Sequence, residues 1–577
     1  MALRVALVTP FAWSQPHDVN EHVAGLARAL RDVGHTVTVL APSNRARELA
    51  AGRRALAAGV GDEELVAVGP AVPISRRSRM GVPVGVRANL SFALATGGFD
   101  VVHGFEPGLP SLSYVALRDS SALTVATFFS AERLAFPPAR TRRERLLSRL
   151  DALLATSEET AEAAAERFPG SYEVVPDGVD PELFEPAEKK TTIVLEWRQA
   201  ERPLLRALVR ELEAFPDWEL VLLRTRPLAS RPPLPRALRG RLHVRSAFDG
   251  RARADVLREA AVFVPALAGV HRVELEARAA GAAVASPHGR ALQPELAAAE
   301  AARLMEDPAF RARRAAEGRA QAERESFQVL ADKVTAVYTA ITSRRRAPST
   351  RTPLGNREWI VVDLHMHTSW SHDCSIEVDD LVDHAEEDGL GAIAVTDHNV
   401  FGGALEALER AKGCDLVVIP GEEVKTAGQG EVIGLFLTEE IPRGLPFSET
   451  VKAIRAQGGL VYLPHPFDRL HAIADSATLH RHLAEIDVFE VYNARLLFEG
   501  YNDEALRFAR KYNLTAGAGS DAHVLQGVGT GAVRMRRFEG PEEFLVSLRS
   551  AEILRRPKSL AYLQGLKWVA QAKERVR

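Results

Sequence analysis

Residues 361–374 read VVDLHMHTSWSHDC, an apolar run that ends in two histidines placed two positions apart. Within a β-strand, positions i and i+2 point to the same side, so His365 and His367 can both reach one ion. A carboxylate, Asp373, follows in the next turn of the chain. The stretch therefore predicts a buried strand that ends in metal-binding side chains.

The same pattern recurs throughout residues 359–577, where other apolar runs become polar only at their carboxyl ends. These runs end in Asp397 and His398, in Glu422 and Glu423, in His465, in Asn493, and in Asp521 and His523. In a parallel barrel the strand ends converge on one face. A buried cluster of imidazoles and carboxylates is costly without a cation, and a donor set without thiolate suits Zn, Mn or Fe alike. The pattern predicts a metal site and leaves the ion open.

The composition is that of a soluble globular protein, with 46% hydrophobic and 26% charged residues and a formal net charge of −3 over 577 residues. This charge argues against bulk nucleic-acid binding. Two cysteines are too few for a disulfide framework, and no apolar run is long enough to cross a membrane. We expect a cytoplasmic protein without a transmembrane segment. Ten of the 17 histidines lie in residues 355–577, which locates the chemistry there.

The chain before this region alternates apolar strands with amphipathic helices, a pattern typical of parallel sheets covered on both faces. We expect one such domain over residues 1–188 and a second over 189–343. Residues 344–358 are rich in Arg and Pro without apolar periodicity, and we interpret them as a solvated linker, with a recognition arm as the alternative. Residues 359–577 form the third domain.

The segments DLHMHTSWSHD, TDHN, PGEEV, HPF and GSDAH resemble the PHP (polymerase and histidinol phosphatase) domain. The resemblance implies a distorted (β/α)7 barrel and a metal-dependent phosphoesterase that holds two or three divalent ions. It assigns His365, His367, Glu423 and Asp521 to a first ion, Glu423 with His465 to a second, and Asp373, His398 and His523 to a third. Glu422 is then a neighbour of the site, and Asp397 orients a ligand or caps the loop.

The expected chemistry is attack on phosphorus by a water that two cations have deprotonated. We expect His365, His367, Glu423, His465 and Asp521 to carry catalysis. Asn493, Arg495, Arg469 and Lys425 follow strand ends and are candidates for binding the substrate phosphate, although each cation is by default a surface charge. His372 is interpreted as a loop residue. Mononucleotides, short oligonucleotides, sugar phosphates and phosphopeptides all remain open as substrates.

Residues 1–343 resemble the retaining GT-B glycosyltransferases of family 4 through VNEHVAGLARALRDVGHTVTVLAP, DVVHGFEP, VVPDGVDPELF and LEARAAGAAVAS. The resemblance implies two Rossmann-like domains that bind a sugar or a nucleotide sugar. Several expected contacts are replaced: His17 and Asp18 stand at the family's Gly-Gly pair, Phe129 at a histidine, and Ala268 at the first of two glutamates, of which Glu276 remains. The phosphate-clamping basic pair is not recoverable around Arg198.

We therefore expect an α/β protein with a degenerate GT-B-like pair of domains followed by a PHP barrel. The leading hypothesis is a metal-dependent phosphoesterase whose N-terminal half binds or regulates. One alternative is a bifunctional protein with an active glycosyltransferase half, and another is a scaffold with a structural metal domain. Oligomeric state is not predicted.

Overall fold

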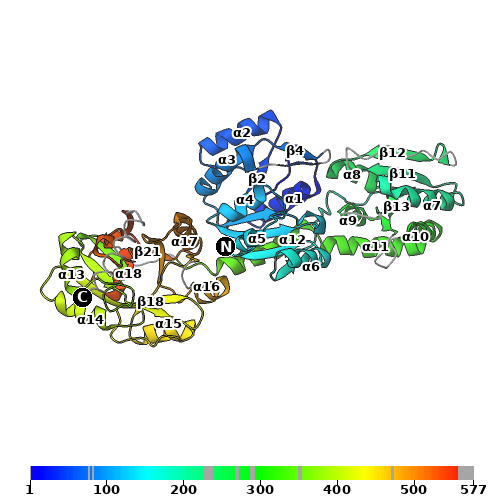
Figure 1. The fold of residues 1–577 in the computed structure, drawn as a ribbon. Coiled ribbons are helices and arrows are strands. Elements are labelled where there is room, and N and C mark those ends of the chain that lie inside the picture. Colours follow the sequence, from blue (N-terminus) through cyan, green and yellow to red (C-terminus); the bar gives the residue numbers. More distant parts are fainter. Residues whose placement is uncertain are drawn as a thin grey trace. The chain divides into compact units, whose positions relative to one another are not determined.

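The computed structural model describes residues 2–75, 78–80, 83–225, 238–266, 272–285, 293–347, 354–469 and 473–556. The chain folds into two compact units, Met1–Thr342 and Ser343–Arg577 (Figure 1). Among the helices of the described residues, none is both long and apolar enough to cross a bilayer.

The N-terminal unit contains two parallel sheets. The first has the order β3-β2-β1-β6-β7-β8-β9 and the second the order β12-β11-β10-β13-β14. The strand order reverses beside β1 and beside β10, as in doubly wound Rossmann-like folds. The elements of the first sheet and its helices are β1 (Arg4–Val8), α1 (Asp18–Asp32), β2 (Thr36–Pro42), α2 (Ala46–Ala57), β3 (Leu65–Gly69), β4 (Val72–Ser75), β5 (Ser78–Met80), α3 (Pro83–Thr96), β6 (Val101–Phe105), α4 (Leu112–Asp119), β7 (Leu123–Phe128), α5 (Arg140–Leu147), β8 (Ala152–Ala155), α6 (Glu158–Arg167) and β9 (Tyr172–Val174).

The second sheet and the helices that follow it complete this unit. Its elements are β10 (Lys190–Glu196), α7 (Arg202–Leu212), β11 (Glu219–Arg224), β12 (Leu242–Ser246), α8 (Gly250–Leu257), β13 (Ala260–Val264), α9 (Arg272–Ala279), β14 (Ala283–Val284), α10 (Pro294–Glu306), α11 (Pro308–Arg324) and α12 (Phe327–Thr342). Helix α12 returns to pack on α1 of the first sheet. A Cβ on Gly25 would lie 2.2 Å from the Phe327 ring, so this close approach requires a glycine.

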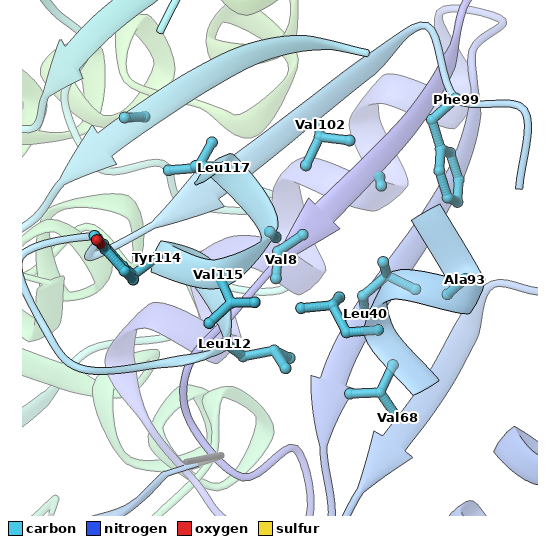
Figure 2. Close-up of a cluster of buried hydrophobic side chains, with 14 of the residues drawn as sticks. Val8, Leu40, Val68, Ala93, Phe99, Val102, Leu112, Tyr114, Val115 and Leu117 are labelled. Carbon is cyan, nitrogen blue, oxygen red and sulfur yellow. The ribbon is translucent and has the colours of Figure 1, made fainter. Parts of the chain in front are cut away.

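Apolar side chains from both faces of each sheet are buried beneath the helices. In the first domain, Figure 2 shows Val8, Leu40 and Val68 from neighbouring strands beside Leu112 and Val115 of α4. Burial of a large aliphatic side chain contributes about 1.5–3 kcal/mol, so such layers supply most of the stabilisation. The second domain has its own clusters on the two faces of its sheet.

The C-terminal unit is built on the sheet β21-β20-β19-β18-β17-β16-β15-β22-β23. Its elements are β15 (Trp359–Met366), α13 (Val378–Glu387), β16 (Ala392–Val395), α14 (Gly402–Arg410), β17 (Val417–Lys425), β18 (Glu431–Leu435), α15 (Phe447–Ala456), β19 (Leu460–Leu463), α16 (Ser476–His482), β20 (Val488–Asn493), α17 (Glu499–Tyr512), β21 (Thr515–Gly519), β22 (Gly531–Arg536), α18 (Gly540–Leu548) and β23 (Glu552–Arg555).

Strands β15 to β21 curl into a nearly closed barrel. The segment after β21 meets β15, because the Asp521 amide donates to the His365 carbonyl (2.7 Å) and Met366 bridges Ala522. Only β18 among these seven strands runs antiparallel to its neighbours, and β22 and β23 extend the sheet outward from β15. The barrel is thus distorted, with parallel strand ends on one face. The predicted α/β fold class, a GT-B-like pair followed by a distorted seven-stranded barrel, is confirmed.

The expected linker differs from the prediction at its start. Arg346 donates from its backbone amide to the Tyr512 carbonyl (3.0 Å), and its guanidinium bonds the carbonyls of Leu483 and Ile486. The Arg345 guanidinium donates to the Lys511 carbonyl (2.8 Å). These arginines belong to the C-terminal unit, because the loop after α16 presents carbonyls that need donors. Residues 348–353 of the expected linker lie outside the described residues.

Candidate functional site

The polar residues at the strand ends of the C-terminal unit gather at one place. His365 on β15, His367 directly after it, Glu423 on β17 and Asp521 after β21 are all buried. The Nε2 atoms of the two histidines lie 3.2 Å apart, and Glu423 Oε2 lies 3.3 Å from His365 Nε2. Asp521 Oδ1 lies 3.5 Å from His367 Nε2. These four residues, from three strand ends, direct their donor atoms at one point.

Two further groups adjoin these four residues. His465 Nε2 lies 3.0 Å from the second oxygen of Glu423, so the two oxygens of this carboxylate face different imidazoles. On the other side, Asp373 Oδ2 lies 3.0 Å from His523 Nε2, and Asp373 Oδ1 lies 3.8 Å from His398 Nε2. We call these eight residues the donor cluster: His365, His367, Asp373, His398, Glu423, His465, Asp521 and His523.

Three sets within the donor cluster place their ligand atoms within 4.8 Å of one another: His365, His367 and Asp521; His365, Glu423 and His465; and His367, His398 and His523. Adjacent sets share an imidazole, and Glu423 presents one oxygen to each side. The chemistry of this donor set fits borderline or hard divalent cations. With the PHP match reported below, it indicates divalent metal binding.

The backbone at the donor cluster is strained where ligands must be aimed. Asp521 has φ 51° and His465 has φ 27°, in the left-handed region that costs a residue with a side chain about 1 kcal/mol or more. Such conformations persist only when the surroundings enforce them. Here the Asp521 amide is held by His365 and the His465 amide by Glu490 (2.6 Å).

Burial and neighbouring charges set the protonation of the donor cluster. Burial and the nearby His523 and His398 hold the pKa of His367 well below its usual range, so this imidazole is neutral and has a free lone pair. Burial favours the neutral form of Asp521, but Arg495 and His365 outweigh it and keep its pKa well below the ordinary value. His367 as a neutral imidazole and Asp521 as an ionised carboxylate are in the forms that bind metals. Burial lowers the pKa of His365, but Glu490, Asp521 and Glu423 outweigh it and hold this pKa well above its ordinary value, so this imidazole must release a proton to bind a cation.

Glu490, a residue outside the predicted set, contacts two residues of the donor cluster. Glu490 on β20 is buried, with Oε1 3.1 Å from His365 Nδ1 and accepting from Tyr462 Oη (2.8 Å). Its Oε2 accepts from the His465 amide (2.6 Å) and from Asn493 Nδ2 (3.1 Å). The sequence reasoning missed this residue, although a carboxylate inside the buried strand VFEVYN was a signal that it needs partners.

Asp397 bonds the loop that follows β15. It accepts from the Thr368 amide and hydroxyl (2.7 Å each) and from Ser371 Oγ (2.7 Å). Ser371 Oγ in turn lies 3.3 Å from His367 Nδ1. Glu422 lies beside the ligand Glu423 on the alternate face of β17, where it accepts from the Ile441 amide, and burial raises its pKa to about 7.

The four substrate-binding candidates divide into two pairs. Arg495 Nη1 lies 3.2 Å from both Asp521 Oδ1 and His523 Nε2, and Asn493 Nδ2 lies 3.3 Å from Asp521 Oδ2. Arg469 and Lys425 are exposed, and no side-chain contact with the donor cluster is present for either within the described residues. His372 is an exposed loop residue whose ring centroid lies 5.8 Å from that of His398.

In the N-terminal unit, two of the residues at the altered glycosyltransferase positions, His17 and Phe129, contact neighbouring residues of the same domain. His17 caps α1, since its Nδ1 accepts from the Val19 amide (3.2 Å), and its ring stacks on Phe11. Asp18 begins the helix. Phe129 is buried with its ring against His22, and Ala268 lies outside the described residues.

Glu276 is engaged by arginine. Arg253 holds both its oxygens (2.5 and 2.7 Å) and also reaches Glu21 on α1 (2.5 Å). Nearby, Asp177 bonds His22 (2.5 Å) and Arg272 (2.8 Å). Arg198, where the basic pair was sought, pairs with Glu196 (2.9 Å). We call Glu21, His22, Asp177, Arg253, Arg272 and Glu276 the ion-pair network.

Comparison with known proteins matches both halves. The model of glycosyltransferase family 4 matches residues 19–183, the PHP domain model matches residues 363–512, and the PHP-associated model matches residues 499–553. An uncharacterized protein of Methanocaldococcus jannaschii is 36% identical over 34% of this chain and 84% of its own length.

A phosphatidyl-myo-inositol mannosyltransferase of Mycolicibacterium smegmatis is 29% identical over 52% of this chain and 81% of its own length. Among solved structures, a sucrose-phosphate synthase of Thermosynechococcus elongatus covers 59% of this chain and 99% of its own, with 16% identity and a TM-score of 0.41. The chain therefore contains a glycosyltransferase family 4 domain in its N-terminal residues and PHP and PHP-associated domains in its C-terminal residues.

Proposed function

We propose that the C-terminal unit hydrolyses phosphate esters, using two or three divalent cations (Mn, Zn or Fe) held by the donor cluster. The observation that carries the proposal is the convergence of three buried ligand sets at the carboxyl ends of the barrel strands. Membership of the PHP family supports the same reaction class.

The assignment of ligands follows the contacts. His365, His367, Glu423 and Asp521 would hold one ion and Glu423 with His465 a second, because the two Glu423 oxygens face opposite groups. Asp373, His398 and His523 would hold a third. When bound, the cations would supply Lewis-acid charge for a phosphoryl oxygen and would lower the pKa of a water.

Protein groups at the edge of the donor cluster would bind and orient the substrate. Arg495 is fixed by Asp521 and His523, so its guanidinium is held ready for a phosphate oxygen at the site. Asn493 contributes an amide beside the same carboxylate. Lys425 and Arg469 are left as exposed charges that could reach only a larger substrate.

The test combines metal analysis with phosphate release from a panel of esters in the presence of Mn²⁺. His365→Ala and Asp521→Ala should each lose bound metal and reduce kcat/KM by at least about a thousandfold, as expected for loss of a metal that activates the nucleophile. His384→Ala is the matched control, because this histidine lies on the outer helix α13. Full metal content and activity in both ligand variants would contradict the proposal.

We further propose that the N-terminal unit binds or regulates and does not transfer sugar. The support is that Glu276 is already saturated by Arg253, and that His17 caps the α1 N-terminus where the family binds a phosphate. The competing function, an active glycosyltransferase, is favoured by the similarity to mannosyltransferases. Turnover of a nucleotide sugar by the full chain, lost in Glu276→Ala, would support the competitor.

A further inference from the structure

Trp370 is the one large aromatic side chain in the loop between the candidate ligands His367 and Asp373. Although tryptophan normally buries most of its surface, 50% of this residue is exposed. Its loop follows β15 on the face of the barrel that carries the donor cluster. The exposed ring therefore lies at the rim of the proposed active site.

The Trp370 ring packs against the first residues of α14. A Cβ on Gly402 would lie 2.3 Å from the ring, and one on Gly403 3.1 Å from it, so the ring packs on the bare backbone at the start of α14. Neither glycine has a positive φ among the described backbone angles, so close approach and not conformation is what requires them. The indole Nε1 donates to Glu406 Oε2 (2.7 Å) and fixes the rotation of the ring.

The same hydrogen bonds that orient a ligand also fix the ring relative to the donor cluster. The Trp370 amide lies 3.3 Å from Thr368 Oγ1, which donates to Asp397 (2.7 Å). The next residue, Ser371, contacts both Asp397 and His367. One carboxylate thus holds the tryptophan loop and a candidate metal ligand together.

A rigid aromatic ring with one side packed and the other open is suited to stacking on a flat ring of a ligand. We propose that Trp370 is a stacking platform for an aromatic or heteroaromatic ring in the alcohol part of the substrate, so that the barrel selects ring-bearing phosphate esters. This inference rests on the proposed phosphoesterase function and narrows its substrate class. Trp370 is a specificity residue in this account and takes no part in the chemical step.

Two esters with the same scissile bond provide the test. Adenosine 5′-monophosphate and ribose 5-phosphate differ at one carbon of the sugar, which carries the heteroaromatic base in the first and a hydroxyl in the second. Because stacking of a base on an aromatic side chain corresponds to roughly a tenfold effect or more, Trp370→Ala should lower kcat/KM for the nucleotide about tenfold and change ribose 5-phosphate less than twofold. Trp370→Phe should recover part of the loss.

Two further variants separate stacking from a structural role. Gly402→Ala retains the tryptophan but displaces its ring, and should produce the same selective loss. Trp359→Ala is the matched control, since Trp359 is 40% exposed at the opposite end of the same strand and packs against Arg536. Equal losses for both esters in Trp370→Ala, or no loss for either, would overturn the inference.

A binding measurement keeps the inference separate from the proposed activity. The nucleotide should quench the tryptophan fluorescence of the wild-type chain more than ribose 5-phosphate does, and Trp370→Phe should remove the difference. If the wild type cleaves neither ester, the hydrolytic proposal fails while this readout still decides the subsite. Equal quenching in wild type and Trp370→Phe would overturn it.

Discussion

The two units treat buried charge in opposite ways. In the ion-pair network of the N-terminal unit, the carboxylates meet arginines: Glu21 and Glu276 contact Arg253, and Asp177 contacts Arg272. In the donor cluster, lone pairs of imidazoles and carboxylates converge instead, and Arg495 touches only the edge. An abundance of buried polar groups therefore does not identify a site: a guanidinium keeps its proton and neutralises a carboxylate permanently, whereas an imidazole can release its proton and bind a cation beside the same carboxylate.

The largest effect is expected from the replacement of Arg253, the residue at the centre of the ion-pair network. Arg253→Met should destabilise the N-terminal unit by about 3–5 kcal/mol, because Glu276 would remain buried without its partner. Chemical denaturation of the full chain measures the change. Arg140→Met, which removes an exposed pair with Glu144, is the control and should cost less than about 1 kcal/mol. If Arg253→Met lowered the free energy of unfolding as little as Arg140→Met does, the buried carboxylates would not depend on Arg253 for neutralisation.

In the donor cluster, the corresponding residue to test is Glu490. This carboxylate accepts from the amide and side-chain donors around it and orients His365 through Nδ1. Glu490→Gln should weaken Mn²⁺ or Zn²⁺ binding by roughly 10- to 100-fold, the usual effect of losing the partner of a ligating histidine. Titration calorimetry gives the affinity. Glu422→Gln, the neighbouring buried acid that contacts no ligand side chain in the described structure, should leave affinity unchanged. Equal affinities of Glu490→Gln and Glu422→Gln for the metal would show that Glu490 does not support metal binding by His365.

A smaller effect, on the pH dependence of stability, should come from His103. The N-terminal unit buries this imidazole, and no carboxylate contacts it among the described residues. Burial, with a minor contribution from His22, lowers the pKa of His103 to about 3, while Tyr338 and Thr127 contact its two nitrogens. Below about pH 6.5, His103 is therefore protonated in the unfolded chain and neutral in the folded chain, so the free energy of unfolding decreases as the pH falls. Between pH 7.5 and pH 5 the loss should be about 2 kcal/mol.

Thermal unfolding at the two pH values, compared between wild type and His103→Asn, isolates the contribution of His103. The variant should be less stable at pH 7.5 but should show a shallower pH dependence. An unchanged slope in His103→Asn would show that another group controls acid sensitivity.

Sequence patterns were sufficient for the elements and for the polar side chains that meet at the strand ends. His365, His367, Glu423 and Asp521 could be named because an apolar run has no local reason to end in such groups. Periodicity likewise indicated two parallel sheets before the barrel. Strand ends are predictable because burial imposes a pattern on every residue that precedes them.

What the sequence could not provide depends on contacts between distant segments. Glu490 lies inside a strand, and its role follows from how β20 lies beside β19 and across from β15. Lys425 ends β17 and Arg469 follows β19, yet both residues are exposed. Residues 344–358 have the Arg- and Pro-rich composition of a linker. The carbonyls that Arg345 and Arg346 bind come from distant segments, which lie beside these arginines only in the folded barrel.

The docking of Arg345 and Arg346 has a practical consequence for dividing the protein. A fragment that starts at residue 355 would strip the guanidinium donors from the carbonyls of Leu483, Ile486 and Lys511 and leave those acceptors to water. A fragment that starts at Ser343 retains them. The hydrolase half should therefore be expressed from the earlier position, because its first stabilising contacts are made before its first strand begins.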